Sequence, residues 1–203
     1  MLVLDHLAVL GQTLTGAVQH VEEVLDVSML PGGAHPRFGT HNRLLGLAPG
    51  LYLEAIAIDP SAPDPGRPRW FGLDGFTGPA RLDKWICRVD DLDKALALLP
   101  EAGEPVALER GSLNWRMAVP PDGLLPYDGL FPALIEWQSD VPPGKALPGS
   151  GCALRRLVVS HPDATNLAGR LGGFLDAPEV VFETGAPGLR ADIDTPAGPV
   201  VLR

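Results

Sequence analysis

The feature of this chain that most constrains its fold is one spacing that occurs three times. Each time, a strand-like apolar run is followed at the same distance by a helical pattern. The strand positions are Leu4, Leu82 and Leu154, and the first helix positions, ten residues later, are Leu14, Leu92 and Ala164. Equal spacings of this kind indicate an internal repeat. The alternative is that strand–helix–strand connections look alike in unrelated folds.

Strand-like segments after each helix extend the repeat to a β-α-β-β-β unit. The first unit, residues 1–58, is predicted to have strands at 2–10, 27–30, 38–47 and 51–58 and a helix at 13–25. The second, 82–138, has strands at 82–89, 104–109, 113–119 and 131–137 and a helix at 92–99. The third, 154–203, has a helix after Asp163 and strands near 179–183, 188–194 and 199–203. Thr13, Asp91 and Asp163 are the expected helix N-caps.

Two proline-rich segments, 59–81 and 138–153, connect the units. The first contains Trp70 and Phe71, which are poor linker residues. We therefore expect it to fold back over an apolar surface.

Composition excludes several classes of function. The chain has 203 residues, of which 45% are hydrophobic, and a formal net charge of −9. That charge argues against a nucleic-acid partner held by phosphate contacts. No apolar run reaches the roughly 20 residues that span a membrane, and the N-terminal segment is predicted to be a strand rather than a signal peptide. Cys87 and Cys152 have no metal or redox spacing. The expected location is cytoplasmic, and no nucleotide-binding loop is found.

Two carboxylates stand inside apolar strands. Glu54 lies in Leu51–Ile58 and Glu136 in the run Ala133–Trp137. A charge facing a dry core is costly, so each must face water, a partner or a metal. Equivalent strands would bring both to one cavity, where they share a metal or where one has a raised pKa and acts as a general base. The alternative is that each pairs with an arginine such as Arg43 or Arg116.

The chain resembles the vicinal oxygen chelate superfamily, which uses tandem β-α-β-β-β units, and within it the glyoxalase-like domains. The matching segments cover about residues 1–140 and are LDHLAV, GGAHPRFGTHNRLLGL, LYLEAIAI, PRWFGLDG, LNWRMAVP and LIEWQSD. The resemblance implies an α+β fold in which the first two of three units form a curved sheet enclosing a cup. It also implies a glyoxalase-like domain over 1–140, with 154–203 as an added third module.

The resemblance implies a divalent metal held by first-strand and last-strand residues of two modules. The matching positions are His6, Glu54, Lys84 with Trp85 beside it, and Glu136. His6, Glu54 and Glu136 suit zinc, manganese, iron or nickel, whereas Lys84 departs from the pattern. His35 or His41 could supply the missing ligand. The alternative for His6 is a strand histidine bonded to a neighbouring carboxylate.

The remaining site predictions concern catalysis and substrate binding. Glu136, Glu54 and His41 are the catalytic candidates. Strand alternation sends His41 and Asn42 to opposite faces, so only one of them can enter the cup. The substrate-binding candidates are Asn42, Trp70, Phe71, Trp115 and Arg116. His161 is interpreted as a turn residue.

The leading hypothesis for function is a metal-dependent lyase, isomerase or dioxygenase acting on a small oxygen-rich molecule. The competing hypothesis is a metal-free protein that sequesters a small molecule, as bleomycin-resistance proteins do. A homodimer is expected because symmetric dimers are the commonest oligomers. The third module would pack on the first pair or complete a dimer in trans.

Overall fold

The computed structural model describes residues 1–48 and 50–203. Three β-α-β-β-β modules follow one another, which confirms the predicted α+β fold. The first contains β1 Val3–Leu10, α1 Leu14–Leu25, β2 Leu30–His35, β3 Thr40–Ala48 and β4 Leu51–Ile58. The second contains β5 Arg81–Arg88, α2 Leu92–Leu98, β6 Glu104–Arg110, β7 Leu113–Val119 and β8 Ala133–Trp137. The third contains β9 Gly149–His161, α4 Ala164–Leu171, β10 Val180–Thr184, β11 Gly188–Thr195 and β12 Gly198–Leu202.

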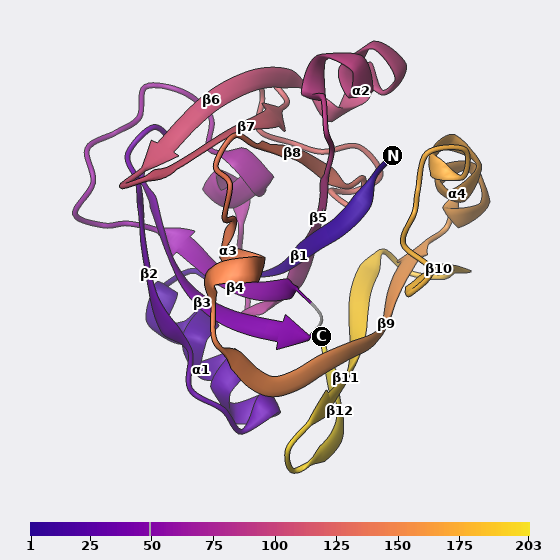
Figure 1. The fold of residues 1–203 in the computed structure, drawn as a ribbon. Coiled ribbons are helices and arrows are strands. Elements are labelled where there is room, and N and C mark those ends of the chain that lie inside the picture. The colour runs from indigo at the N-terminus through magenta and orange to yellow at the C-terminus, as the bar shows by residue number, and fades with distance from the viewer. Residues whose placement is uncertain (49) are drawn as a thin grey trace.

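The strands of the described residues form one curved sheet of twelve strands. In each of the first two modules the first strand pairs in parallel with the last, β1 with β4 and β5 with β8. Antiparallel pairing of β1 with β5 joins the two modules at the centre of the sheet. The cup is therefore built around this central pair, which runs through the middle of Figure 1.

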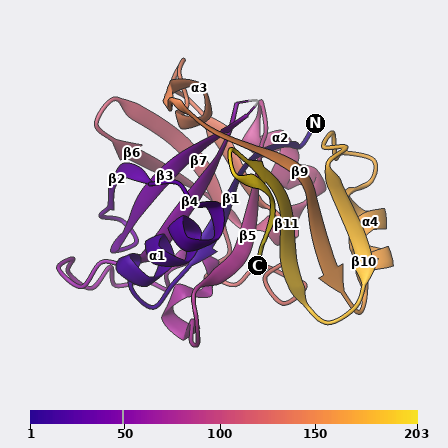
Figure 2. The same ribbon diagram turned by 90° about the horizontal axis from the view of Figure 1, so that it is seen from below.

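The third module has the same element order but a different strand order. Its first strand, β9, lies between β10 and β11, whereas β12 pairs with β11 at the edge. The start of β9 also pairs in parallel with β3, so the third module continues the sheet of the first. Figure 1 shows these orange and yellow strands beside the cup, and Figure 2 shows α4 next to β10.

Local sequence explains the helices on the outer face of the cup. The hydroxyl of Thr13 accepts from the Gly16 N–H and caps α1, and Asp91 accepts from the Lys94 N–H and caps α2. Ala17, Val21 and Leu25 are fully buried along one face of α1. None of the helices in the described residues is long and apolar enough to cross a membrane.

The irregular segments differ from prediction in two places. The strand expected at 27–30 is β2 at Leu30–His35, because the sheet continues through Gly32 and Gly33 with a register shift instead of turning there. The connection 138–153 contains a short helix, α3 Pro143–Ala146, and the start of β9. The segment 59–81 does fold back. Its 3-10 turn, η1 Trp70–Gly75, buries Trp70 and Phe71.

Candidate active site

A β-bulge places two polar side chains of β1 together. Leu4 pairs with Cys87 and His6 with Ile86, so Asp5 is an extra residue without its own partner on β5. Asp5 and His6 are each 4% exposed. The Asp5 Oδ1 atom lies 2.7 Å from His6 Nδ1. Because this carboxylate accepts the Nδ1 proton, the His6 ring is held with its Nε2 atom toward the cup.

Glu54 lies opposite this Nε2 atom. Its Oε2 atom is 3.8 Å from His6 Nε2, and its Oε1 atom accepts a hydrogen bond from the Asn42 amide. Glu54 is 6% exposed. Asn42 is itself fixed, because its Oδ1 atom accepts from the Gly33 N–H at 2.8 Å. The predicted approach of His6 to Glu54 is therefore present, and Asn42 rather than His41 enters the cup.

These residues line a small cavity between the first two modules. Its volume is about 30 Å³, which is room for one or two water molecules. Its lining is His6, His35, Asn42, Leu44, Tyr52, Glu54, Trp70, Phe71, Arg110, Trp115, Met117, Ile135, Trp137 and Pro143. The substrate-binding candidates Asn42, Trp70, Phe71 and Trp115 thus line the cavity, and their role in binding stays a prediction.

Aromatic rings hold the polar groups in place. Tyr52 stacks on the His6 ring with centroids 4.2 Å apart. Burial, together with the charges of Asp5 and Glu54, raises the pKa of Tyr52 well above its usual value, so the phenol stays neutral. Trp137 donates its indole N–H to Asp5 Oδ2 at 3.1 Å.

His35 is a neutral wall of the cavity. Burial and the nearby Arg110 charge lower its pKa from 6.5 to about 3. Its Nδ1 atom lies 3.1 Å from Thr40 Oγ1. The ring packs edge-on between Trp70 and Trp115, with centroid distances of 5.1 and 6.2 Å. His35 is therefore a buried residue of the cavity wall.

Arg110 brings a positive charge from the end of β6 into this cavity. Its Nη1 atom lies 3.2 Å from Asn42 Oδ1 and 3.5 Å from His35 Nε2. The side chain crosses the backbone of Gly33, where a Cβ atom would stand 2.5 Å from Arg110 Cδ. Glycine at position 33 is thus required for this approach.

The predicted meeting of Glu54 and Glu136 is wrong. Glu136 accepts from the Leu92 N–H of α2 and from Arg116, at 3.2 Å each. Arg116 also pairs with Asp93 of α2. Both side chains therefore lie on the outer, helix-covered face, whereas their strand neighbours line the cavity. Glu136 is therefore not a metal ligand or catalytic group of this cavity. Arg116 is not a substrate contact in it.

Strand register explains the error. The helix starts Leu14 and Leu92 set an offset of 78 residues between the modules, which makes Ile86 the counterpart of Ala8. Ala8 pairs with Glu54, but Ile86 pairs with Ala133. Glu136 is three residues further along, an odd number that turns a strand side chain to the opposite face.

Two other candidates also lie outside the cavity. His41 lines a cleft beside α1 with Arg43, and its Nδ1 atom is 4.0 Å from Asp59. The Lys84 ammonium pairs with Asp83, and Gly129 lies close to it. His161, interpreted as a turn residue, is instead the last residue of β9, where it bonds to Asp128 and to the Asp163 N–H.

The donor set does not fit the four-ligand metal site implied by the resemblance. Across residues 1–48 and 50–203, no group of three or more His, Cys, Asp or Glu side chains is arranged to hold a metal. His6 and Glu54 are two suitable donors. The second module presents Ile135 and Met117 on the facing wall, which are not ligands for the predicted metals.

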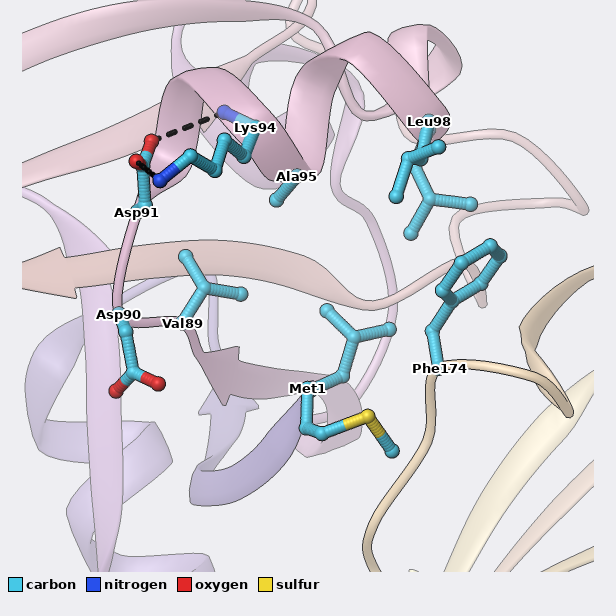
Figure 3. Close-up of a pocket in the computed structure, with 10 residues that line it drawn as sticks. Met1, Val89, Asp90, Asp91, Lys94, Ala95, Leu98 and Phe174 are labelled. Carbon is cyan, nitrogen blue, oxygen red and sulfur yellow. Dashed lines mark hydrogen bonds and ion pairs between the residues drawn. The ribbon is translucent and has the colours of Figure 1, made fainter.

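The larger cavity in Figure 3 has different chemistry. It has a volume of about 300 Å³ and lies between α2, the N-terminal strand and Phe174. Its charged side chains are Asp90, Asp91 and Lys94, and the last two pair with each other. Leu98 and Phe174 point into it from opposite sides. It contains no histidine among the described residues, so it offers no counterpart to the His6–Glu54 pair.

Asp5, Tyr52 and Arg110 are site residues that sequence reasoning missed. Asp5 is adjacent to His6, but strand alternation predicts that it points away, and only the bulge reverses this. Arg110 stands before a glycine turn, and nothing in the sequence signals its reach toward β3.

The fold is that of the vicinal oxygen chelate superfamily. A family model described as a glyoxalase-like domain matches residues 4–175, and the chain belongs to this family. No curated protein matches the chain.

Several solved structures are similar to the chain at low identity. A hypothetical protein from Staphylococcus aureus is 13% identical, with a TM-score of 0.63, over 99% of this chain and 84% of that one. Methylmalonyl-CoA epimerase from Mycobacterium tuberculosis is 20% identical, with a TM-score of 0.42, over 66% of this chain and 85% of that one. A variant of the Streptomyces coelicolor epimerase, in complex with 2-nitronate-propionyl-CoA, is 12% identical, with a TM-score of 0.44, over 67% of this chain and 97% of that one.

Proposed function

We propose that this protein is an isomerase or lyase that moves a proton at a carbon next to a carbonyl group. The observation that carries the proposal is the pair of His6 Nε2 and Glu54 Oε2, 3.8 Å apart at one cavity. A base must reach the proton that it removes, and both atoms face the space where a substrate carbon would lie.

The two groups have different supports, which suits them to different steps. Asp5 fixes the His6 ring, so that Nε2 can accept a proton and Asp5 stabilises the resulting imidazolium. Asn42 holds Oε1 of Glu54 and leaves Oε2 directed at His6. The group that takes the proton from carbon can pass it to the other across this gap of 3.8 Å, and the second group then returns that proton to the product.

Both proton transfers use side chains of the chain itself. If a cation bound, His6 and Glu54 would hold it, and it would supply polarisation of a substrate oxygen. The two transfers between carbon and these side chains need no such ion.

Hydrogen exchange at carbon tests this proposal without knowledge of the natural substrate. The protein, stripped of metal with a chelator, is incubated in D₂O with a panel of small 2-oxo and 2-hydroxy carbonyl compounds. Deuterium incorporation is followed by NMR. We expect exchange with at least one compound, and a loss of roughly 10²–10⁴-fold in His6→Asn and Glu54→Gln. Glu136→Gln is the matched control and should exchange normally. No exchange with any compound, or an equal loss in the control, would contradict the proposal.

A second candidate function is metal-free sequestration of a small molecule. The aromatic walls favour it, because Tyr52, Trp70, Trp115 and Trp137 enclose the cavity and such rings bind small organic molecules. Native mass spectrometry of freshly purified protein distinguishes the two functions. A bound compound that is released chemically unchanged supports sequestration, whereas a mixture of substrate and isomer supports the enzyme.

A further inference from the structure

Arg110 is a cation that faces a cavity without a carboxylate partner. Among the described residues its hydrogen-bond partners are Asn42 and His35, and no acidic side chain lies within ion-pair distance. A guanidinium stays charged at every accessible pH and presents several donors in a planar fork. The charge of the Arg110 guanidinium is therefore available to pair with a bound anion.

Asn42 separates this cation from the carboxylate of Glu54. Its amide nitrogen donates to Glu54, and its amide oxygen accepts from Arg110 Nη1. One buried amide thus holds a negative group on one side and a positive group on the other. A carbon acid needs this polarity, because the proton leaves toward a base while negative charge develops on oxygen.

We infer that Arg110 binds an oxyanion, and that the substrate is a small organic acid whose carboxylate or enolate oxygen meets this guanidinium. The inference rests on the proposed function and specifies its substrate class. In this arrangement Arg110 supplies the positive charge that the incomplete metal donor set does not. Removal of a proton by His6 or Glu54 leaves the electron pair on the substrate as an enolate, whose oxygen hydrogen-bonds to Arg110.

The position of Arg110 is built into the fold. It is the last residue of β6, and it reaches β3 across the boundary between the first two modules. The missing side chain at Gly33 leaves the space that its methylene groups occupy. His35, the other partner, is buried between two tryptophans. The guanidinium is therefore held in place before a ligand arrives, which reduces the entropy lost on binding.

Anion binding is tested directly with formate and acetate, which match the small size of the cavity. The probes are titrated at constant ionic strength into metal-stripped protein, and the indole N–H signals of Trp115 and Trp137 are followed by NMR. We expect saturable binding to the wild-type protein. Arg110→Met should weaken it at least roughly tenfold, because a charge-assisted hydrogen bond is lost. Arg110→Lys, which retains the charge but not the fork, should give an intermediate affinity.

Arg43→Met is the matched control. Arg43 is exposed on β3, one residue from Asn42 but on the opposite face. Its substitution therefore removes the same charge from outside the cavity. We expect its affinity to stay within about twofold of the wild type. Glu54→Gln should bind either anion as well as the wild type or better, because a nearby negative charge is removed.

Three results would overturn the inference. They are no saturable binding to the wild type, equal binding by Arg110→Met once its folding is verified by thermal melting, and binding that appears only after zinc is added back to the metal-stripped protein. The test is independent of the exchange experiment. Anion binding without carbon exchange keeps this site and rejects the proposed function, whereas exchange of neutral carbonyl compounds without anion binding does the reverse.

Discussion

Glu54 and Glu136 stand in corresponding last strands of two sister modules, yet they have opposite surroundings. Glu54 faces the cavity between the first two modules and meets His6 and Asn42. Glu136 faces α2, where an arginine and a helix N-terminal amide hold it. A carboxylate in an apolar strand therefore indicates an unusual neighbour, but it does not indicate whether that neighbour is a cavity or a helix. The inner face supports chemistry, and the outer face supports the attachment of a helix.

The largest expected effect is a difference in turnover between variants of the two carboxylates. Glu54→Gln keeps the shape of the side chain but removes the base, so turnover should fall by roughly 10²–10⁴-fold. Glu136→Gln should leave turnover within about twofold, since it is remote from the cavity. Steady-state kinetics on any compound that exchanges deuterium provides the measurement. Similar losses of turnover in both variants would contradict the different roles of Glu54 and Glu136.

The second effect concerns acid stability and a histidine on the inner face. Because the pKa of His35 falls from 6.5 to about 3 on folding, the unfolded chain binds the proton more readily. Stability is therefore retained above pH 6.5 and lost as the pH falls toward 3. At pH 5 the protonation of this group lowers the free energy of unfolding by about 2 kcal/mol relative to neutral pH.

Urea unfolding of His35→Gln at pH 7 and pH 5 isolates this contribution. Between pH 7 and pH 5 the free energy of unfolding should fall by about 2 kcal/mol less in the variant than in the wild type. His20→Gln, on the surface of α1, is the control and should follow the wild type. An identical pH dependence in wild type and His35→Gln would show that His35 does not remain neutral in the fold.

The smallest effect concerns the outer carboxylate. Glu136→Ala removes the partner of Arg116 and of the α2 N-terminus, both partly accessible to water, and should lower the free energy of unfolding by about 1 kcal/mol. The difference from wild type should shrink in about 1 M salt, where exposed charges are screened. Thermal or urea unfolding at two salt concentrations measures it, and a loss that does not depend on salt would argue for a packing defect.

Sequence patterns predicted the fold better than the site. Apolar periodicity and the caps Thr13 and Asp91 are local, so they located α1 and α2 closely. The face toward which a strand residue points depends on pairing with distant strands, and a shift of one residue reverses it. This explains both Asp5, which a bulge turned inward, and Glu136, which register turned outward. Arg110 acts through a long side chain, for which no spacing rule exists.

The contact between Gly33 and Arg110 has a consequence for the evolution of this family. A side chain at position 33 and an arginine at position 110 compete for the same space, with only 2.5 Å between a Cβ atom and Arg110 Cδ. The two positions, far apart in the chain, should therefore covary among homologous sequences. Homologues that keep glycine and arginine together are expected to share an organic-acid substrate. Those that replace both have lost the cation, and their chemistry should have diverged.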